Sequence, residues 1–277
     1  MIDGKTTIIA HIGYPTETFK SPMIYNPWFQ ARGINAAVIP MGCKAADYAS
    51  FLKLVLRLSN VSGALITMPH KVSTLDLVDE ATVSAKIAGA CNGVRIDERG
   101  VMIGDMFDGE GFVRGLARNG RKAAGASVLV AGSGGVGSAI AASIAKAGAV
   151  RLGLFDAFAS SMNSLAERLT AHYPKLAVTT GSNDPAGYDI VVNATPLGMK
   201  KDDPLPFDVA RISPTTFVGE VVMKEEITPF LAAVRAKGCG YQVGTDMLFE
   251  QIPAYLEFFG FGSVTSDELR KCAQIHY

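Results

Sequence analysis

The chain has 277 residues, of which 48% are hydrophobic, and its 26 Lys and Arg balance its 26 Asp and Glu. This length allows one large domain or two modest ones, and the composition allows a sizeable buried core. A net charge of zero gives no electrostatic reason to expect binding to nucleic acid or to an anionic membrane. No apolar run approaches the ~18 residues that span a bilayer, and the first ten residues lack the basic-then-apolar order of a signal peptide. We therefore expect a cytoplasmic protein whose partner is a small-molecule substrate.

The cysteines and histidines are widely separated along the chain. No C-x-x-C pair occurs among Cys43, Cys91, Cys239 and Cys272, which favours free thiols in a reducing compartment. The scattered histidines give little support to a metal site, and none is expected.

The first part of the chain alternates runs of strand character with segments of helical character. A helix over residues 21–31 would begin at Ser21 and Pro22, since serine caps helices and proline suits the first turn. Residues 73–88 are expected to be helical in two pieces. The other elements predicted here are strands at 6–13, 36–42 and 63–68, a helix at 46–58, and a hairpin of 93–96 with 101–104.

The stretch 127–148 predicts the phosphate-binding turn of a dinucleotide-binding unit. Val128–Ala131 is a short, uncharged apolar run typical of a buried parallel strand. Gly132, Gly134 and Gly137 follow at the G-x-G-x-x-G spacing. In that order, these glycines would allow a tight turn, let the backbone approach a pyrophosphate, and let the helix pack close to the strand. The helix that follows would offer unpaired N–H groups and its positive dipole end to the phosphates. A Gly-rich turn without a ligand is the alternative.

The remaining chain continues the same alternation. A strand at 152–155 ends at Asp156, where an acid would bind the ribose hydroxyl of NAD. The pattern predicts an α/β fold with a parallel, doubly wound sheet and ligands at the C-terminal ends of its strands. The further elements expected are helices at 160–172, 228–237, 247–259 and 266–273, and strands at 177–181, 189–195, 216–222 and 241–244.

Three polar residues stand where apolar segments end, which is where an α/β protein keeps its chemistry. Lys71 follows a strand that Pro69 cannot continue, so it would lie at the C-terminal mouth of that strand. Asn92 follows a Gly-Ala-Cys turn, and Asp108 is followed closely by glycines. The alternatives are a solvated lysine that caps a turn, an ordinary turn asparagine, and an N-cap for a helix that begins near residue 111.

In order and spacing, the chain resembles the shikimate dehydrogenase family over nearly its whole length. The opening residues 13–15 and 21–22 are similar to G-x-P-I-x-H-S-x-S-P, and residues 67–71 are similar to T-x-P-x-K. Residues 89–92 are similar to G-A-x-N, and residues 108–112 match D-G-x-G-F. Residues 193–199 match N-A-T-P-x-G-M, and residues 247–251 match M-L-x-x-Q.

The resemblance implies two domains with a catalytic cleft between them. A βαβ substrate-binding domain would comprise residues 1–108, completed by the C-terminal helices within 247–277. A dinucleotide-binding Rossmann domain would comprise residues 109–246. The resemblance also implies that the chain acts in the shikimate pathway of aromatic amino acid biosynthesis. We expect the chain to be a monomer or homodimer.

The resemblance also implies roles for individual residues. Lys71 and Asp108 would be the catalytic pair, Thr67, Asn92 and Gln251 would bind the ring hydroxyls, and Ser21 would bind the carboxylate. Phe19 and Thr18 would line the same pocket. The residues expected to contact the cofactor are Gly132, Gly134, Gly135, Val136, Gly137, Asp156, Asn193, Thr195, Pro196, Val221, Gly244 and Met247.

The implied reaction moves a hydride between nicotinamide C4 and a ring carbon of a polyhydroxylated cyclohexene carboxylate. Lys71 would take the hydroxyl proton as base, or donate it as ammonium in the reverse reduction. The Asp108 carboxylate would favour the charged lysine, while burial would favour the neutral one. Which of the two effects dominates is left open by the sequence.

Several residues depart from the family pattern. Phe19 replaces the first of two carboxylate-binding serines, Thr18 replaces the histidine before it, and a phenyl ring makes no such hydrogen bonds. Met106 and Phe107 replace an asparagine and a threonine. The D-x-V-Y-x-P stretch carries Glu220, Val222, Met223 and Glu225 instead, so its tyrosine hydroxyl is absent. These changes favour a divergent member whose substrate is shikimate, quinate, an amino analogue or something unrelated.

The cofactor is expected to be NAD, with NADP less favoured. Family members that use NADP carry Asn-Arg-Thr after the second strand, whereas this chain has Asp156, Ala157 and Phe158. A carboxylate would repel the 2′-phosphate but can accept the ribose hydroxyls. Asp156 as a plain turn residue is the alternative.

Two other functions fit parts of the pattern. A nucleotide-sensing protein without catalysis would have no need of both Lys71 and Asp108. A different two-domain dehydrogenase, such as one that acts on a folate, would not explain residues 108–112 and 193–199.

Overall fold

A computed structural model describes residues 2–200 and 202–276, so Met1 and Tyr277, the outer ends of the predicted substrate domain, lie outside the described residues. The chain forms two compact units. The first contains the chain up to Phe107 together with Ile252–His276, and the second is Asp108–Gln251.

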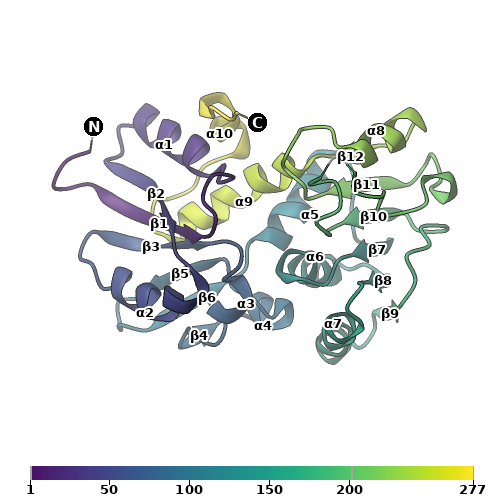
Figure 1. Ribbon diagram of the computed structural model, residues 1–277, viewed down its shortest axis with the longest axis horizontal. Coiled ribbons are helices and arrows are strands. Elements are labelled where there is room, and N and C mark those ends of the chain that lie inside the picture. The colour runs from purple at the N-terminus through teal and green to yellow at the C-terminus, as the bar shows by residue number, and fades with distance from the viewer. Residues whose placement is uncertain (1, 201, 277) are drawn as a thin grey trace. The chain divides into compact units, whose positions relative to one another are not determined.

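The first unit is built on a mixed sheet with strand order β2-β1-β3-β5-β6-β4 (Figure 1). Its first three strands are parallel, as the predicted βαβαβ order requires, and β5 and β6 form the predicted antiparallel hairpin. The strands are β1 (Thr7–Gly13), β2 (Ala36–Gly42), β3 (Val61–Ile66), β4 (Glu80–Ala81), β5 (Gly93–Ile96) and β6 (Met102–Asp105). The helices are α1 (Pro22–Ala31), α2 (Ala45–Val55), α3 (Lys71–Thr74), α4 (Val83–Ala88) and α10 (Ser266–Cys272).

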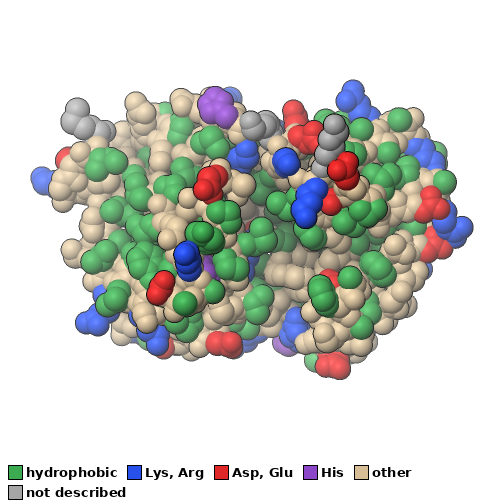
Figure 2. All heavy atoms as spheres, in the orientation of Figure 1, with side chains coloured by type: hydrophobic (Ala, Val, Ile, Leu, Met, Phe, Trp, Pro, Cys, Tyr) green, Lys and Arg blue, Asp and Glu red, His purple; other side chains and the backbone are tan. Residues whose placement is uncertain are grey.

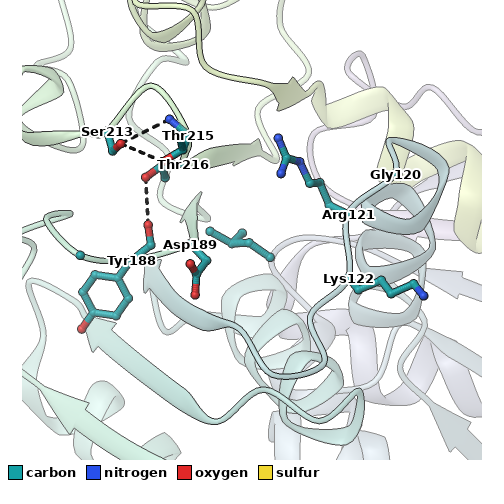
Figure 3. Close-up of a pocket in the computed structure, with 10 residues that line it drawn as sticks. Gly120, Arg121, Lys122, Tyr188, Asp189, Ser213, Thr215 and Thr216 are labelled. Carbon is teal, nitrogen blue, oxygen red and sulfur yellow. Dashed lines mark hydrogen bonds between the residues drawn. The ribbon is translucent and has the colours of Figure 1, made fainter.

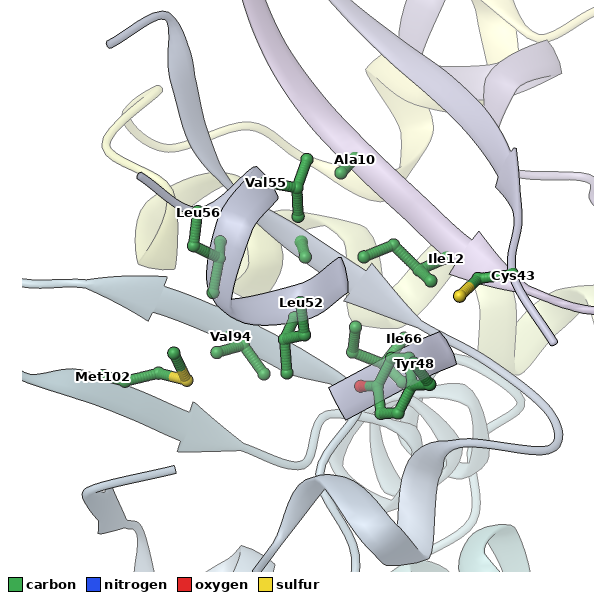
Figure 4. Close-up of a cluster of buried hydrophobic side chains, with 11 residues drawn as sticks. Ala10, Ile12, Cys43, Tyr48, Leu52, Val55, Leu56, Ile66, Val94 and Met102 are labelled. Carbon is green, nitrogen blue, oxygen red and sulfur yellow. The ribbon is translucent and has the colours of Figure 1, made fainter. Parts of the chain in front are cut away.

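One face of this sheet packs against α2 and forms an apolar core. Ala10 and Ile12 of β1, Ala64 and Ile66 of β3 and Leu52 of α2 belong to one buried cluster. Figure 4 shows Leu52 of α2 near Val94 and Ile66 of the sheet. Because side chains alternate along a strand, Ile9, His11 and Gly13 face the opposite side of the sheet. The two faces of β1 therefore serve different purposes, one for the core and one that carries a histidine.

The second unit is an all-parallel sheet with strand order β12-β11-β10-β7-β8-β9 (Figure 1). The strand order reverses between β7 and β10, which is where a doubly wound sheet opens a crevice for its ligand. The strands are β7 (Ser127–Ala131), β8 (Arg151–Phe155), β9 (Ala177–Thr180), β10 (Ile190–Asn193), β11 (Phe217–Glu220) and β12 (Tyr241–Gln242). The helices are α5 (Asp108–Arg118), α6 (Gly135–Lys146), α7 (Ala159–His172), α8 (Pro229–Ala236), α9 (Gly244–Phe258) and the 3₁₀ turn η1 (Val209–Arg211). Helix α9 continues from this unit into the first.

The predicted domain boundaries differ from these units at both crossings. Asp108 groups with the second unit because it is the first residue of α5, which packs on α6. Residues 247–251 also group with the second unit, since the first half of α9 lies against α5. The two-residue strand β4 was not predicted from the sequence, because a strand this short produces no periodic pattern.

Among the described residues, no helix combines the length and apolar character needed to cross a membrane. On the face drawn in Figure 2, basic and acidic side chains are interspersed, in keeping with the balanced composition.

Candidate active site

Lys71 lies beyond the C-terminal end of β3, next to a buried polar cluster. The cluster consists of His70, Tyr48 and Thr74. Lys71 is the first residue of α3, and His70 before it is 1% exposed. The His70 ring stacks on Tyr48, with centroids 3.9 Å apart, and its Nε2 lies 2.8 Å from the Cys43 carbonyl oxygen. Thr74 Oγ1 donates to the His70 carbonyl at 2.7 Å, and the Tyr48 hydroxyl lies 2.6 Å from Thr74 Oγ1. The sequence did not single out His70, Tyr48 or Thr74, which fix the backbone on both sides of the lysine.

Near the C-terminal ends of β1 and β3, four residues lie close together: Gly13, Thr67, Phe19 and His11. A Cβ at Gly13 would lie 2.4 Å from Thr67 Cγ2 and 2.9 Å from Phe19 Cζ, so only glycine fits between them. The Phe19 ring stacks on His11 with a centroid distance of 4.1 Å. Thr67 and Phe19, two residues assigned to the substrate pocket from sequence, are therefore brought together.

His11 was not predicted from the sequence as a site residue. Its position as a polar residue near the end of the apolar strand β1 could have indicated it. It is 6% exposed and its Nδ1 has no hydrogen-bond partner. Burial, aided by the charge of Lys71, lowers the pKa of His11 to about 3. The imidazole is therefore neutral at physiological pH, and the site holds a buried polar atom able to meet a ligand.

In the first unit, Asn92 and Ser21 each have a polar group that a ligand could bind. Asn92 is fully buried, and its Oδ1 accepts from the Phe107 backbone N–H at 2.8 Å, while its Nδ2 has no partner. Ser21 is the residue before the first turn of α1, as predicted, but its hydroxyl makes no capping hydrogen bond. Thr18 is exposed. An unpartnered buried amide is costly unless a ligand or water satisfies it.

Asp108 begins α5 instead of capping a helix that starts near residue 111, so the N-cap alternative was wrong. The glycines after it are required by close packing. A Cβ at Gly109 would lie 2.0 Å from the Ala139 carbonyl oxygen of α6, and one at Gly111 would lie 2.5 Å from the Met247 carbonyl oxygen of α9. Gly111 also lies against Gln251, whose Oε1 is buried without a partner. The D-G-x-G-F pattern thus allows α5 to pack closely on α6 and α9.

The glycine loop has the geometry expected of a phosphate-binding turn. Gly132 has φ +100°, and a Cβ at Gly137 would lie 1.9 Å from the Gly132 carbonyl oxygen. Gly134 has nothing within 4 Å of its Cβ position and is exposed, so its backbone is open to a ligand. Gly135 and Val136 form the first turn of α6, whose N–H groups and dipole suit a pyrophosphate. The cradle therefore fits a dinucleotide.

Asp156 lies directly beside this loop. Its Oδ2 accepts from the Ser133 backbone N–H at 2.5 Å, and its Oδ1 accepts from the Phe158 backbone N–H at 2.8 Å. Each carboxylate oxygen retains a further lone pair. Phe158 itself is 74% exposed.

The loops after β10 and β11 form a second polar network at the same edge. Asn193 Nδ2 donates to the Leu197 carbonyl at 3.0 Å and to Glu220 Oε1 at 2.8 Å. Its Oδ1 accepts from the Thr195 N–H at 3.1 Å and from Thr195 Oγ1 at 2.6 Å. The other residues assigned to the cofactor here are the exposed Pro196, the half-buried Val221, and the buried Gly244 and Met247.

A hollow of about 580 Å³ lies elsewhere on the second unit. Its lining includes Asp189 and Ile190 at the start of β10 and Thr216 just before β11, with Arg121 and Lys122 across from them (Figure 3). It therefore lies at the N-terminal ends of the strands, opposite the glycine loop.

Among residues 2–200 and 202–276, His, Cys, Asp and Glu form no group of three or more suited to a metal.

A six-stranded parallel sheet with a glycine loop beyond its central strand defines the second unit as a Rossmann-type dinucleotide-binding fold. The model of the shikimate dehydrogenase substrate binding domain matches residues 11–94. Shikimate dehydrogenase (NADP(+)) of Acidiphilium cryptum is 32% identical over 278 residues, which cover 97% of this chain and 96% of that protein. The chain belongs to the shikimate dehydrogenase family, and it is a nicotinamide-dependent oxidoreductase.

Two solved structures extend the comparison to neighbouring activities. Quinate dehydrogenase from Corynebacterium glutamicum, in complex with NAD, has a TM-score of 0.86 and 29% identity and covers 96% of this chain and 98% of that one. The 5-ketofructose reductase of Gluconobacter sp. strain CHM43, in a ligand-free form, has a TM-score of 0.86 and 26% identity, and 98% of each chain is covered.

Proposed function

We propose that this chain oxidises a ring hydroxyl of a polyhydroxylated cyclohexene or cyclohexane carboxylate of the shikimate type, and reduces the ketone in the reverse direction. The observation that carries the proposal is the retention of both Lys71 and Asp108, at the matching motifs, in a chain that aligns with a shikimate dehydrogenase over nearly its full length. A binding protein without catalysis would need neither. When bound, the nicotinamide accepts or supplies the hydride.

Lys71 moves the proton in this proposal. As a free amine, its Nζ takes the proton from the substrate hydroxyl, and as ammonium it returns a proton to the ketone oxygen. The stacked His70–Tyr48 pair and the Thr74 hydrogen bond favour a fixed backbone under Lys71. Asp108, the first residue of α5, is the second catalytic group in this proposal, as its place in the D-G-x-G-F motif implies.

The substrate residues proposed from the family are Ser21, Thr67, Asn92 and Gln251. The unpartnered Nδ2 of Asn92 and Oε1 of Gln251 support this role, because each is a buried polar atom that a ring hydroxyl would satisfy. The Ser21 hydroxyl, unused in capping, is available to accept or donate. Phe19 and Thr18 are proposed from the resemblance to line the same pocket.

The cofactor proposed is NAD in preference to NADP. The Asp156 carboxylate beside the glycine loop can accept ribose hydroxyls and would repel a 2′-phosphate. The two arginines that flank Asp156 along the sequence make other hydrogen bonds: Arg151 Nη2 donates to the Gly187 carbonyl at 2.6 Å, and Arg168 Nη1 donates to Ser164 at 2.7 Å. The Acidiphilium relative is named for NADP(+), so this preference separates the chain from it.

A second substrate class is favoured by one observation. The Phe19 ring, stacked on a neutral His11 and lying against Gly13, stands where the family has a carboxylate-binding serine. Such an apolar wall suits a polyhydroxylated substrate without a carboxylate, and the structurally similar 5-ketofructose reductase is named for one.

A substrate panel tests the proposal. Shikimate, quinate and an amino analogue would each be assayed for oxidation with NAD and with NADP, and a ketose without a carboxylate would be assayed for reduction with NADH and with NADPH. Turnover of a cyclohexene or cyclohexane carboxylate is the expected result. Turnover of the ketose alone would replace the first substrate class by the second, and an absence of dinucleotide binding would contradict the proposed function.

A further inference from the structure

Glu220 is a fully buried carboxylate at the C-terminal edge of the second unit. It is the last residue of β11 and has 0% exposure. Burial raises its pKa to about 7, against the opposing effect of its hydrogen bonds. Placing a carboxyl group in the interior is costly, and an apolar residue of similar volume would be cheaper there. A feature that breaks the rules of core packing in this way usually has a purpose near a functional site.

Four donors from three chain segments converge on this carboxylate. Oε1 accepts from Asn193 Nδ2 at 2.8 Å and from the backbone N–H groups of Val221 at 3.2 Å and Val222 at 3.3 Å. Oε2 accepts from Thr228 Oγ1 at 3.1 Å, and Thr228 in turn caps α8 through the Leu231 N–H. Glu220 therefore connects the end of β10, the loop after β11 and the start of α8.

The bond to Glu220 fixes which way the Asn193 amide faces. Both Nδ2 hydrogens are used, one by Glu220 and one by the Leu197 carbonyl, and Oδ1 accepts two hydrogen bonds from Thr195. An asparagine amide has two donors and one acceptor oxygen with two lone pairs, so all of its capacity is filled. Without the carboxylate, one donor of Asn193 would be left unpaired inside the protein, and the turn 193–198 would lose its support.

The segments that Glu220 holds are those that lie against the cofactor loop and the start of α9. A Cβ at Gly132 would lie 2.5 Å from the Ala194 carbonyl oxygen, directly after Asn193. A Cβ at Gly244 would lie 2.4 Å from the Val222 carbonyl oxygen. A shift of the turn after Asn193 would therefore displace Gly132, and a shift of the loop 221–222 would displace Gly244. Both glycines are assigned to the cofactor site.

We propose that Glu220 is a positioning residue for the nicotinamide end of the cofactor site, acting through Asn193 and the loop 221–222. This inference rests on the proposed function, because it takes those loops to line the pocket of the nicotinamide. Glu220 does not touch the reacting atoms, and its effect is on how well the cofactor is held and oriented.

The test compares two substitutions on the same strand. Glu220→Ala removes the carboxylate, and Val218→Ala removes apolar bulk from a fully buried neighbour in β11 that belongs to the core and not to the network. Both should lower the melting temperature. We expect only Glu220→Ala to weaken NAD binding by the folded protein, by about tenfold or more, which corresponds to ~1.4 kcal/mol. Val218→Ala should stay within about twofold of the unchanged chain.

Glu220→Gln and amide hydrogen exchange complete the design. Gln keeps one acceptor oxygen for Asn193, so it should restore most of the NAD affinity and remains informative if the Ala variant does not fold. The amides of Thr195, Leu197, Val221 and Val222 should exchange faster in Glu220→Ala than in Val218→Ala. Equal NAD affinity and equal exchange in the two Ala variants would overturn the proposal. Failure of the unchanged chain to bind NAD or NADP would instead overturn the proposed function.

Discussion

At the scale of single residues, Phe19 carries the chain's clearest departure from its family. The resemblance to the family assigns it to a serine position, and its ring lies against Gly13 and His11. If the substrate's carboxylate is bound by Ser21 alone, shikimate should have a high KM. Phe19→Ser should then lower that KM by roughly 10–100-fold, because a hydrogen bond to a charged group contributes about 1.5–3 kcal/mol.

The measurement is the KM for shikimate in both forms, with Leu54→Ser as a control, since Leu54 is an exposed apolar residue of α2 outside every proposed site. An unchanged KM in Phe19→Ser would mean that the ring does not border the carboxylate position.

Glu220 gives a pH prediction at the same scale. Its pKa is about 7 in the folded protein against an ordinary value of 4.5. Between these values the folded state keeps a proton that the unfolded chain has lost, so this group's contribution to the free energy of unfolding decreases as pH rises from about 4.5 to 7. Its full contribution is present below that range and is lost above it, with a size on the order of 3 kcal/mol.

Urea unfolding of the unchanged chain and of Glu220→Gln at pH 5 and pH 8 isolates this effect. The difference in stability between the two proteins should favour the unchanged chain more at the lower pH. A difference that does not vary with pH would show that Glu220 does not titrate in this range.

At the scale of elements, the turn between β7 and α6 depends on two glycines for different reasons. A Cβ at Gly137 would lie 1.9 Å from the Gly132 carbonyl oxygen, so Gly137→Ala should force the loop apart and destabilise the fold by about 1–3 kcal/mol. Gly134 has an ordinary φ of −72° and nothing within 4 Å, so Gly134→Ala should fold normally and lose dinucleotide affinity.

Melting temperature and NAD affinity, measured on both variants, separate steric from ligand effects. Normal NAD affinity in Gly134→Ala would mean that the pyrophosphate does not pass over this residue.

Local signals predicted most of the elements, and contacts between distant segments explain what they missed. The β-branched strands, the Ser21-Pro22 helix start and the hairpin of 93–96 with 101–104 follow from neighbouring residues, and the structure confirms them. The start of α5 at Asp108 depends instead on glycines that let it pack against α6 and α9, which periodicity cannot reveal. His70, Tyr48 and Thr74 were missed for the same reason, because they meet only after β3 and α2 have packed.

The candidate site shows the same division. The glycine spacing, Lys71 and Asp108 were visible as motifs, and Asp156 was visible as the end of a strand. The role of Glu220 was not, since its four donors come from residues up to 27 positions away.

At the scale of the whole molecule, cofactor choice depends on the charge beside the glycine loop. NAD should exceed NADP in kcat/KM by about one to two decades, equivalent to roughly 1.4–2.7 kcal/mol. Asp156→Ala should narrow this ratio by improving NADP, because it removes the repulsion of the 2′-phosphate. Asp189→Ala serves as the control, since Asp189 lies at the opposite ends of the strands. An NADP preference in the unchanged enzyme would contradict the assignment.

Lys71 offers the most direct test of the central claim that this chain is a dehydrogenase with a lysine acid–base group. The measurement is kcat on the best substrate of the panel for the unchanged chain, for Lys71→Ala and for Lys86→Ala, which alters an exposed lysine of α4. Lys71→Ala should lower kcat by about 10²–10⁴-fold while the affinities for substrate and cofactor change little. Lys86→Ala should match the unchanged chain. Asp108→Asn should show a similar loss that does not add fully to that of Lys71→Ala, since the two groups act as a unit. Unaltered turnover in Lys71→Ala would contradict the account.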